Sequence, residues 1–146
     1  MNYSLIYVST VCNPLDKDAL ELLAANAQKF NQEHGLTGLL LYTGDHFLQM
    51  LEGDYHELTP LFERIEKDDR HHSVEVVLGA PATKRNFPDW SMGVLDVSKS
   101  SKLDHASMRY ICDHAEGQPD AAGDVALKML DMFRFDLVDD SGSHSI

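Results

Sequence analysis

Two polar side chains fall in segments whose other residues suit a buried strand, and such a pair could bind a ligand or relay a proton. Tyr7 lies in the apolar segment 3–9, and Gln49 lies in the apolar segment 46–51. A buried amide without hydrogen bonds costs on the order of 1–3 kcal/mol, so Gln49 needs partners. From the residues alone we favour a structural tyrosine–glutamine hydrogen bond, and a pair that also contacts a ligand stays open.

Other candidate side chains are less distinctive on their own. Charged residues gather after the second predicted helix, which is typical of a solvated helix end, although an anion or ligand site is the alternative. They include Arg64, Asp68, Arg70 and His71. Asn31 suits a helix cap, and Trp90 and Met92 suit packing.

No familiar catalytic, nucleotide-binding or metal motif accompanies these residues. The sequence has no GxGxxG between strand and helix, no phosphate-binding lysine loop, no HExxH and no GxSxG. His105, Cys112 and His114 lack the spacing of metal ligands, and we expect them at the surface. A bound nucleotide would therefore need another architecture.

Alternating and helical patterns predict the elements that must position the candidate residues. Asp16 suits the cap of the first helix and Gly35 its end, and the second helix follows Gly53. The predicted strands are segments 3–9, 36–42, 46–51, 74–78 and 91–97.

The order strand, helix, strand, strand, helix, strand predicts an α+β, ferredoxin-like βαββαβ sheet with both helices on one face. The first and third strands of that sheet are neighbours, which would bring Tyr7 and Gln49 together. The fifth strand has no position that the pattern fixes. We expect a domain at 1–97, a helical appendage at 98–138 and a mobile tail at 139–146.

Composition narrows the class of protein. A net charge of −12 would repel a phosphate backbone, so we expect no nucleic-acid partner. No segment approaches the ~20 apolar residues of a membrane span, and we expect no membrane association. Cys12 and Cys112 lie far apart and suit reduced thiols in a cytoplasmic protein.

Five motifs in order resemble the BLUF family, sensors of blue light that use flavin adenine dinucleotide (FAD). The resemblance covers about residues 1–97 and leaves the appendage unexplained. The motifs are LIY at 5–7, FN at 30–31 followed by GLTGLL at 35–40, FLQMLEG at 47–53, DDRHH at 68–72 and NFPDWSM at 86–92. Phe30 departs from the pattern, since some relatives carry a polar side chain there.

The resemblance implies a non-covalently bound FAD whose ring lies between the two helices. Leu23 and Ile65 would lie against the ring faces and Asn31 at its polar edge. Arg64, Asp68, Arg70 and His71 would lie near the pyrimidine end and the ribityl chain.

The resemblance also implies a photochemical role for the polar pair. Light would drive an electron and then a proton from Tyr7 to the flavin through Gln49, and the amide of Gln49 would afterwards rotate, change tautomer or do both. Trp90 and Met92 would carry the change to the fifth strand, and which of them faces inward is not readable from the pattern.

The implied function is a non-enzymatic photoreceptor that signals to an unidentified protein partner and forms a dimer or larger homo-oligomer. One alternative is a ferredoxin-like interaction module without functional photochemistry. Another is flavin redox turnover, for which the architecture that the resemblance implies offers no evident substrate pocket and no paired acid and base in the required places.

Overall fold

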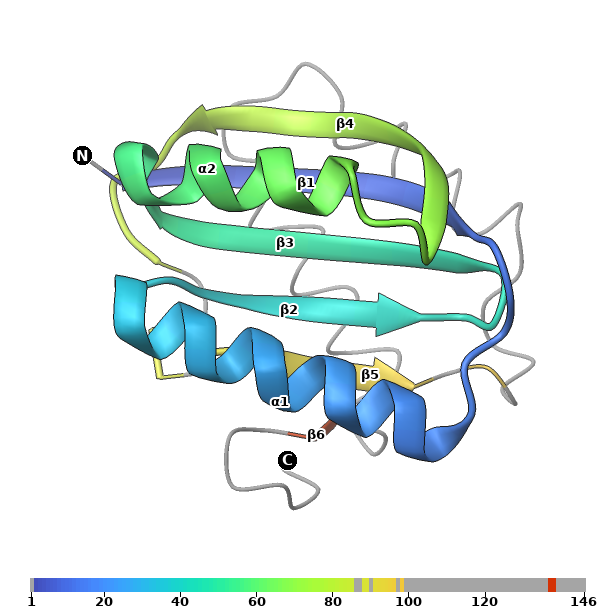
Figure 1. Ribbon diagram of the computed structural model, residues 1–146. Helices are drawn as coiled ribbons and strands as arrows, with labels where there is room; N and C mark the ends of the chain where they lie inside the picture. Colours follow the sequence, from blue (N-terminus) through green and yellow to red (C-terminus); the bar gives the residue numbers. More distant parts are fainter. Residues whose placement is uncertain (1, 86–87, 90, 97, 99–136, 139–146) are drawn as a thin grey trace.

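The computed structural model describes residues 2–85, 88–89, 91–96, 98 and 137–138. Its elements follow the predicted order (Figure 1). They are β1 (Asn2–Val11), α1 (Lys17–His34), β2 (Thr37–Tyr42), β3 (His46–Asp54), α2 (Tyr55–Glu66), β4 (His71–Pro81), β5 (Gly93–Asp96) and β6 (Leu137–Val138).

The ends of α1 show how local chemistry sets the elements. Asp16 accepts a hydrogen bond from the Ala19 N–H at 2.7 Å, which satisfies a donor that the first helical turn leaves unpaired. Gly35 ends the helix with φ = 67°, a left-handed conformation that glycine adopts without steric cost. Both residues hold the positions that the sequence predicted.

The sheet has the order β4-β1-β3-β2-β5-β6, and its first four strands pair antiparallel in the ferredoxin-like arrangement. Strand β5 lies beside β2 and runs parallel to it, which answers the question that the pattern left open. Strand β6 pairs with β5, whereas we predicted a helix through residues 137 and 138. The open edge of β5 offers the backbone partners that turn these two residues into a strand.

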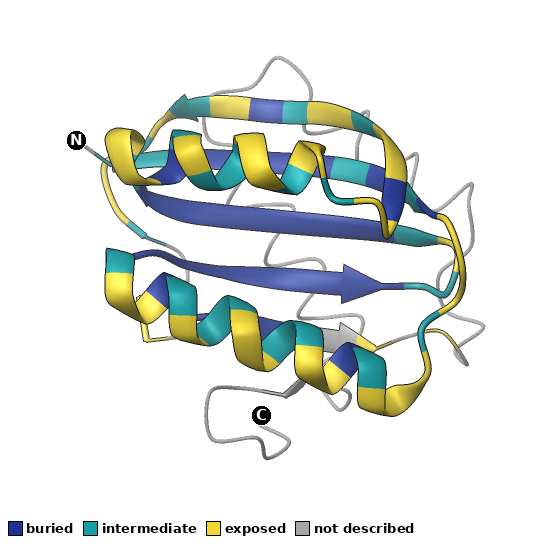
Figure 2. Cartoon of the chain, in the orientation of Figure 1, coloured by how far each residue is buried: buried dark blue, intermediate teal, exposed yellow. Residues whose placement is uncertain are grey.

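Both helices lie over the same face of the sheet (Figure 1). Their apolar side chains pack with the inner face of the strands into one cluster that includes Leu5, Leu20, Leu51 and Leu58. Alternate strand residues are buried on the other face, and β2 and β3 are buried along almost their whole length (Figure 2). Strands buried on both faces read as continuous apolar runs, as segment 36–42 does.

Within the described part of the chain, neither helix is long and apolar enough to cross a bilayer. Trp90, residues 99–136 of the predicted helical appendage and the tail 139–146 lie outside the described residues.

Candidate functional site

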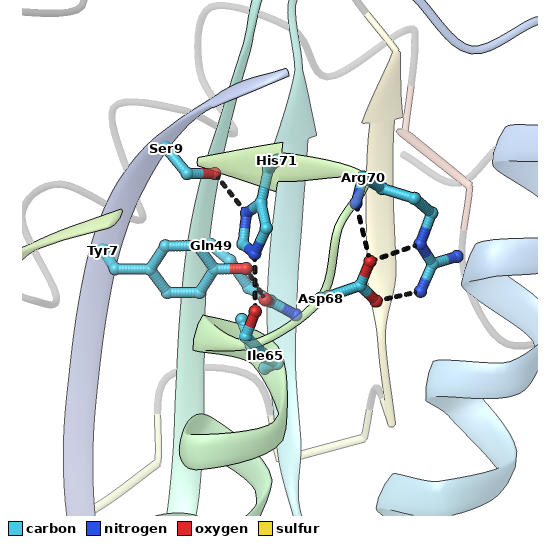
Figure 3. A network of polar contacts seen from close by, with 7 residues as sticks. All are labelled: Tyr7, Ser9, Gln49, Ile65, Asp68, Arg70 and His71. Atoms are coloured by element: carbon cyan, nitrogen blue, oxygen red, sulfur yellow. Dashed lines mark hydrogen bonds and ion pairs between the residues drawn. The ribbon is translucent and has the colours of Figure 1, made fainter. Parts of the chain in front are cut away.

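Tyr7 and Gln49 stand directly opposite each other on β1 and β3, as the sheet order requires. Both side chains are buried, and the Tyr7 hydroxyl donates a hydrogen bond of 2.5 Å to Gln49 Oε1 (Figure 3). Burial raises the pKa of Tyr7 well above its ordinary value of 10, because a phenolate would lose its hydration. The carboxylate of Asp68 raises it further. The pair therefore rests as a neutral phenol and an accepting amide oxygen.

The other end of the Gln49 amide contacts Met92. Nε2 lies 3.6 Å from Met92 Sδ, within reach of an N–H to sulfur hydrogen bond, and Met92 is fully buried. This contact orients the amide, because a thioether sulfur accepts but has no hydrogen to donate. Of the two residues for which the sequence left the inward position open, Met92 faces Gln49, and Trp90 is outside the described residues.

A cavity of about 220 Å³ opens beside this pair, between the two helices and the sheet. All nine of the predicted tyrosine and cofactor-contacting residues line it: Tyr7, Leu23, Asn31, Gln49, Arg64, Ile65, Asp68, Arg70 and His71. Asn26, Ala27, Phe30, Leu40, Phe47 and Leu61 complete the lining. The structure thus brings the predicted residues together at one cavity.

Asn31 has one satisfied and one unsatisfied end. Its Nδ2 donates to the Ser91 carbonyl at 2.6 Å, while its Oδ1 is buried and has no hydrogen-bond partner among the described residues. The reversed amide would place Oδ1 against the Ser91 carbonyl oxygen, and two acceptors cannot form a hydrogen bond. The Ser91 carbonyl therefore fixes the orientation of the Asn31 amide. An unpaired buried acceptor costs about 1–3 kcal/mol, and a ligand N–H would remove that cost.

The far rim of the cavity carries the charges. Arg70 forms an ion pair with Asp68 through two side-chain contacts (Figure 3). Hydrogen bonding from Arg70 lowers the pKa of Asp68 to about 2, so this carboxylate stays charged under physiological conditions. The charges of Asp68 and Arg70 offset each other, and Arg64 gives the rim one further positive charge.

His71 closes the same side of the site and is already bonded to protein. Its Nε2 lies 2.6 Å from the Ile65 carbonyl and must donate to it, and its Nδ1 lies 2.7 Å from the Ser9 hydroxyl (Figure 3). The ring centroid is 6.1 Å from that of Tyr7. His71 therefore offers the cavity its ring surface and ties β1 to the end of α2.

Phe30 bridges the two helices at the cavity. Its ring stacks on His34 with centroids 4.0 Å apart, and the Arg64 guanidinium lies 4.9 Å from its centroid. These two partners hold the ring of Phe30 in place, so the ring can form a rigid side of the cavity against which a flat ligand packs.

Sequence reasoning missed the polar residues that support the site from outside the cavity. Gln28 donates to the Met92 carbonyl at 2.9 Å, and Ser9 contacts His71. The spacing of Gln28, Asn31 and Gln32 is a signal that could have been used, because residues three and four apart share one helix face.

Comparison with known proteins gives relatives for this arrangement. The beta subunit of photoactivated adenylate cyclase from Euglena gracilis is 34% identical over 109 residues, which are 73% of this chain and 12% of that protein. The blue light- and temperature-regulated antirepressor BluF of Escherichia coli K12 is 30% identical over 94 residues, 64% of this chain and 23% of that protein. The chain thus spans less than a quarter of the length of these two relatives.

The dark-state structure of BlrB, a BLUF protein, is similar over 90% of this chain and 95% of its own, with a TM-score of 0.63 and 29% identity. The family profile described as sensors of blue light using FAD matches residues 3–93, more than half of the chain. The paired tyrosine and glutamine, the cavity beside them and this match agree, and the chain belongs to the BLUF family.

Proposed function

We propose that this chain is a blue-light receptor in which FAD places its ring in the cavity between α1 and α2 and in which Tyr7, Gln49 and Met92 form the light-responsive chain. The observation that carries the proposal is the buried hydrogen bond from Tyr7 to Gln49 at the cavity wall. The family match supports blue-light sensing with FAD.

The cavity fits a ring system with a hydrogen-bonding edge. Its 220 Å³ is below the roughly 300–1,000 Å³ of pockets that enclose whole drug-sized ligands, so it suits the ring, with the rest of FAD outside. Leu23 on α1 and Ile65 on α2 supply apolar contact for the ring faces. The unsatisfied Oδ1 of Asn31 supplies an acceptor for an N–H at the ring edge.

The charged rim suits the polar remainder of the cofactor. Arg64 and Arg70 are the cations there, and Asp68 partly neutralises Arg70 through their ion pair. We assign Arg64, Asp68, Arg70 and His71 to the pyrimidine end and the ribityl chain, with His71 contributing ring contact.

The photochemistry starts from a protonated Tyr7. When bound, FAD supplies absorption of blue light and an electron acceptor. With FAD bound, Tyr7 would give up one electron to it and then its hydroxyl proton to Gln49 Oε1, as the Tyr7 O–H bond breaks. Gln49 would pass a proton from its Nε2 to the bound FAD, and the return of both electron and proton would restore Tyr7 and Gln49. Gln49 suits this relay because an amide accepts at one end and donates at the other.

The lasting change is a rearranged Gln49 amide, by rotation, tautomer formation or both. After a rotation, Oε1 would face the sulfur of Met92, which cannot donate to it. The contact between Gln49 and Met92 would then be lost. Met92 directly precedes β5, so this strand is positioned to respond.

The response would reach an unidentified protein partner as a population shift, without turnover of a substrate. The similarity to BlrB over 95% of that chain supports a short sensor of this kind. We also propose a homo-oligomer, a dimer or larger, as the resemblance to short sensors of this family implies.

A light-minus-dark absorption spectrum tests the proposal. Purified protein should be yellow and should show a small red shift on illumination. Tyr7→Phe and Gln49→Leu should each keep FAD and lose the normal red shift, because each removes one partner of the 2.5 Å bond.

Tyr55→Phe is a matched control, since Tyr55 is exposed on α2 and does not line the cavity. A normal shift in Tyr7→Phe or Gln49→Leu would remove that residue from the mechanism. Wild-type protein that stays colourless with ample flavin would favour the interaction module without photochemistry.

A further inference from the structure

One face of α1 holds the residues that lead into β5. Gln28 Nε2 donates to the Met92 carbonyl at 2.9 Å, Asn31 Nδ2 donates to the Ser91 carbonyl at 2.6 Å, and Gln32 Nε2 lies 3.4 Å from Ser91 Oγ. Positions i, i+3 and i+4 of a helix face the same way, so the three amides act on one short segment. We call these three side chains the amide clamp.

The clamp and the photochemical chain meet at Met92. Gln28 holds the carbonyl of Met92, while Gln49 contacts its sulfur. Met92 is fully buried, so one residue of the core makes both contacts.

Asn31 gives the clamp a second connection to the cavity. One end of its amide holds Ser91, and the other end is the unsatisfied acceptor beside the cavity. Gln28 does not line the cavity and therefore acts on the segment alone.

We propose that the amide clamp of α1 sets the dark position of Ser91–Met92 and thereby determines how far a change at Gln49 spreads into β5, with Gln28 as a positioning residue. This inference rests on the proposed function. With the clamp intact, β5 is held against β2 in the dark and loosens when light removes the Gln49 contact. Without the Gln28 bond, the segment loosens in the dark as well.

Amide hydrogen exchange of residues 91–96, measured by mass spectrometry, tests this inference. In the dark, Gln28→Ala should exchange about 2- to 10-fold faster than wild type over 91–96, which corresponds to losing one hydrogen bond. The same increase should appear in flavin-free protein, because the bond does not involve FAD. The light-minus-dark difference in exchange should shrink accordingly.

Two further variants separate the lost bond from general damage. Lys29→Ala removes a long side chain at the neighbouring exposed position of α1 and should exchange like wild type. Gln28→Lys restores a donor and should return exchange of 91–96 toward wild type. Gln28→Leu replaces Gln28→Ala should the latter fold poorly, as judged by circular dichroism.

The absorption spectrum separates this inference from the proposed function. Gln28→Ala should keep the wild-type red shift, because Tyr7 and Gln49 are unchanged. Unchanged dark exchange over 91–96 in Gln28→Ala, or an equal increase throughout α1 and α2, would overturn the clamp. Absence of a red shift in wild type would instead refute the proposed function and leave the flavin-free exchange result to decide on the clamp.

Discussion

Tyr7 keeps its hydroxyl proton in the folded protein. Its ring packs against Phe62 at 5.7 Å and His71 at 6.1 Å between centroids, and its hydroxyl has Gln49 as acceptor. Burial and the charge of Asp68 raise its pKa, and the charge of Arg70 opposes them only in part. The neutral phenol of Tyr7 is therefore a proton donor, and the acceptor of its proton is Gln49 Oε1.

The raised pKa of Tyr7 predicts a loss of stability in alkali. The folded protein keeps this proton where the unfolded chain releases it, so the contribution is complete below pH 10 and falls as pH rises toward the folded-state pKa. Above pH 10 the free energy of unfolding should fall by about 1.4 kcal/mol more per pH unit in wild type than in Tyr7→Phe. Denaturant unfolding at several pH values measures this.

The comparison with Tyr7→Phe isolates one of the five tyrosines of the chain. Equal slopes in the two proteins would mean that Tyr7 ionises as readily in the folded state as in the unfolded state.

The unsatisfied oxygen of Asn31 predicts a specific loss of cofactor affinity. Asn31→Ala should weaken FAD binding about 2- to 10-fold, because one hydrogen bond at the ring edge is lost. Asn26→Ala is the matched control, since Asn26 also lines the cavity but is exposed. Flavin fluorescence titration of the two variants gives the ratio, and equal affinities would place the ring edge elsewhere.

The sequence predicted Tyr7 and Gln49 because polar side chains in apolar strands are conspicuous. It could not predict the inward position of Met92. Met92 contacts Gln28 and Gln49, which lie 64 and 43 residues earlier in the chain, and contacts of this kind leave no local pattern.

The β2–β3 pair that carries Gln49 depends on a close approach at Gly38. A Cβ at this position would lie 2.1 Å from the Met50 carbonyl oxygen, which is backbone and cannot move aside. Gly38→Ala should therefore destabilise the protein by about 1–3 kcal/mol and disturb the neighbouring Gln49. Thermal unfolding and the light-minus-dark spectrum measure the two effects.

Gly79→Ala is the control on strand β4. Its Cβ would meet the Tyr3 hydroxyl at 2.8 Å, at the end of a side chain that can shift. We expect a smaller loss of stability and an unchanged spectrum. A larger loss at Gly79 than at Gly38 would contradict this account of the β2–β3 contact.

The helices and the first four strands were predictable because their patterns are local. Asp16 and Gly35 bound α1, and apolar runs mark the strands. The position of β5 in the sheet was not predictable. The sequence of a strand at a sheet edge does not indicate which strand it pairs with. Strand β6 falls at the end of the predicted helical appendage at 98–138, and its two residues are too few to show the alternation that marks a strand.

At the scale of the whole molecule, the oligomeric state is the property most open to direct measurement. We expect static light scattering to give at least twice the 16.4 kDa mass of one chain, in the dark and at two protein concentrations. A mass of one chain at both concentrations would refute the predicted oligomer.

The single carboxamide of Asn31 faces two parts of the protein. Its Oδ1 lies beside the cavity, and its Nδ2 donates to the carbonyl of Ser91, just before β5. Under the proposed function, Asn31 would therefore link the retention of FAD to the response of β5. A substitution of Asn31 would then change both the affinity for FAD and the response of β5. A substitution of Gln28 would change the response of β5 and leave the affinity for FAD unaltered.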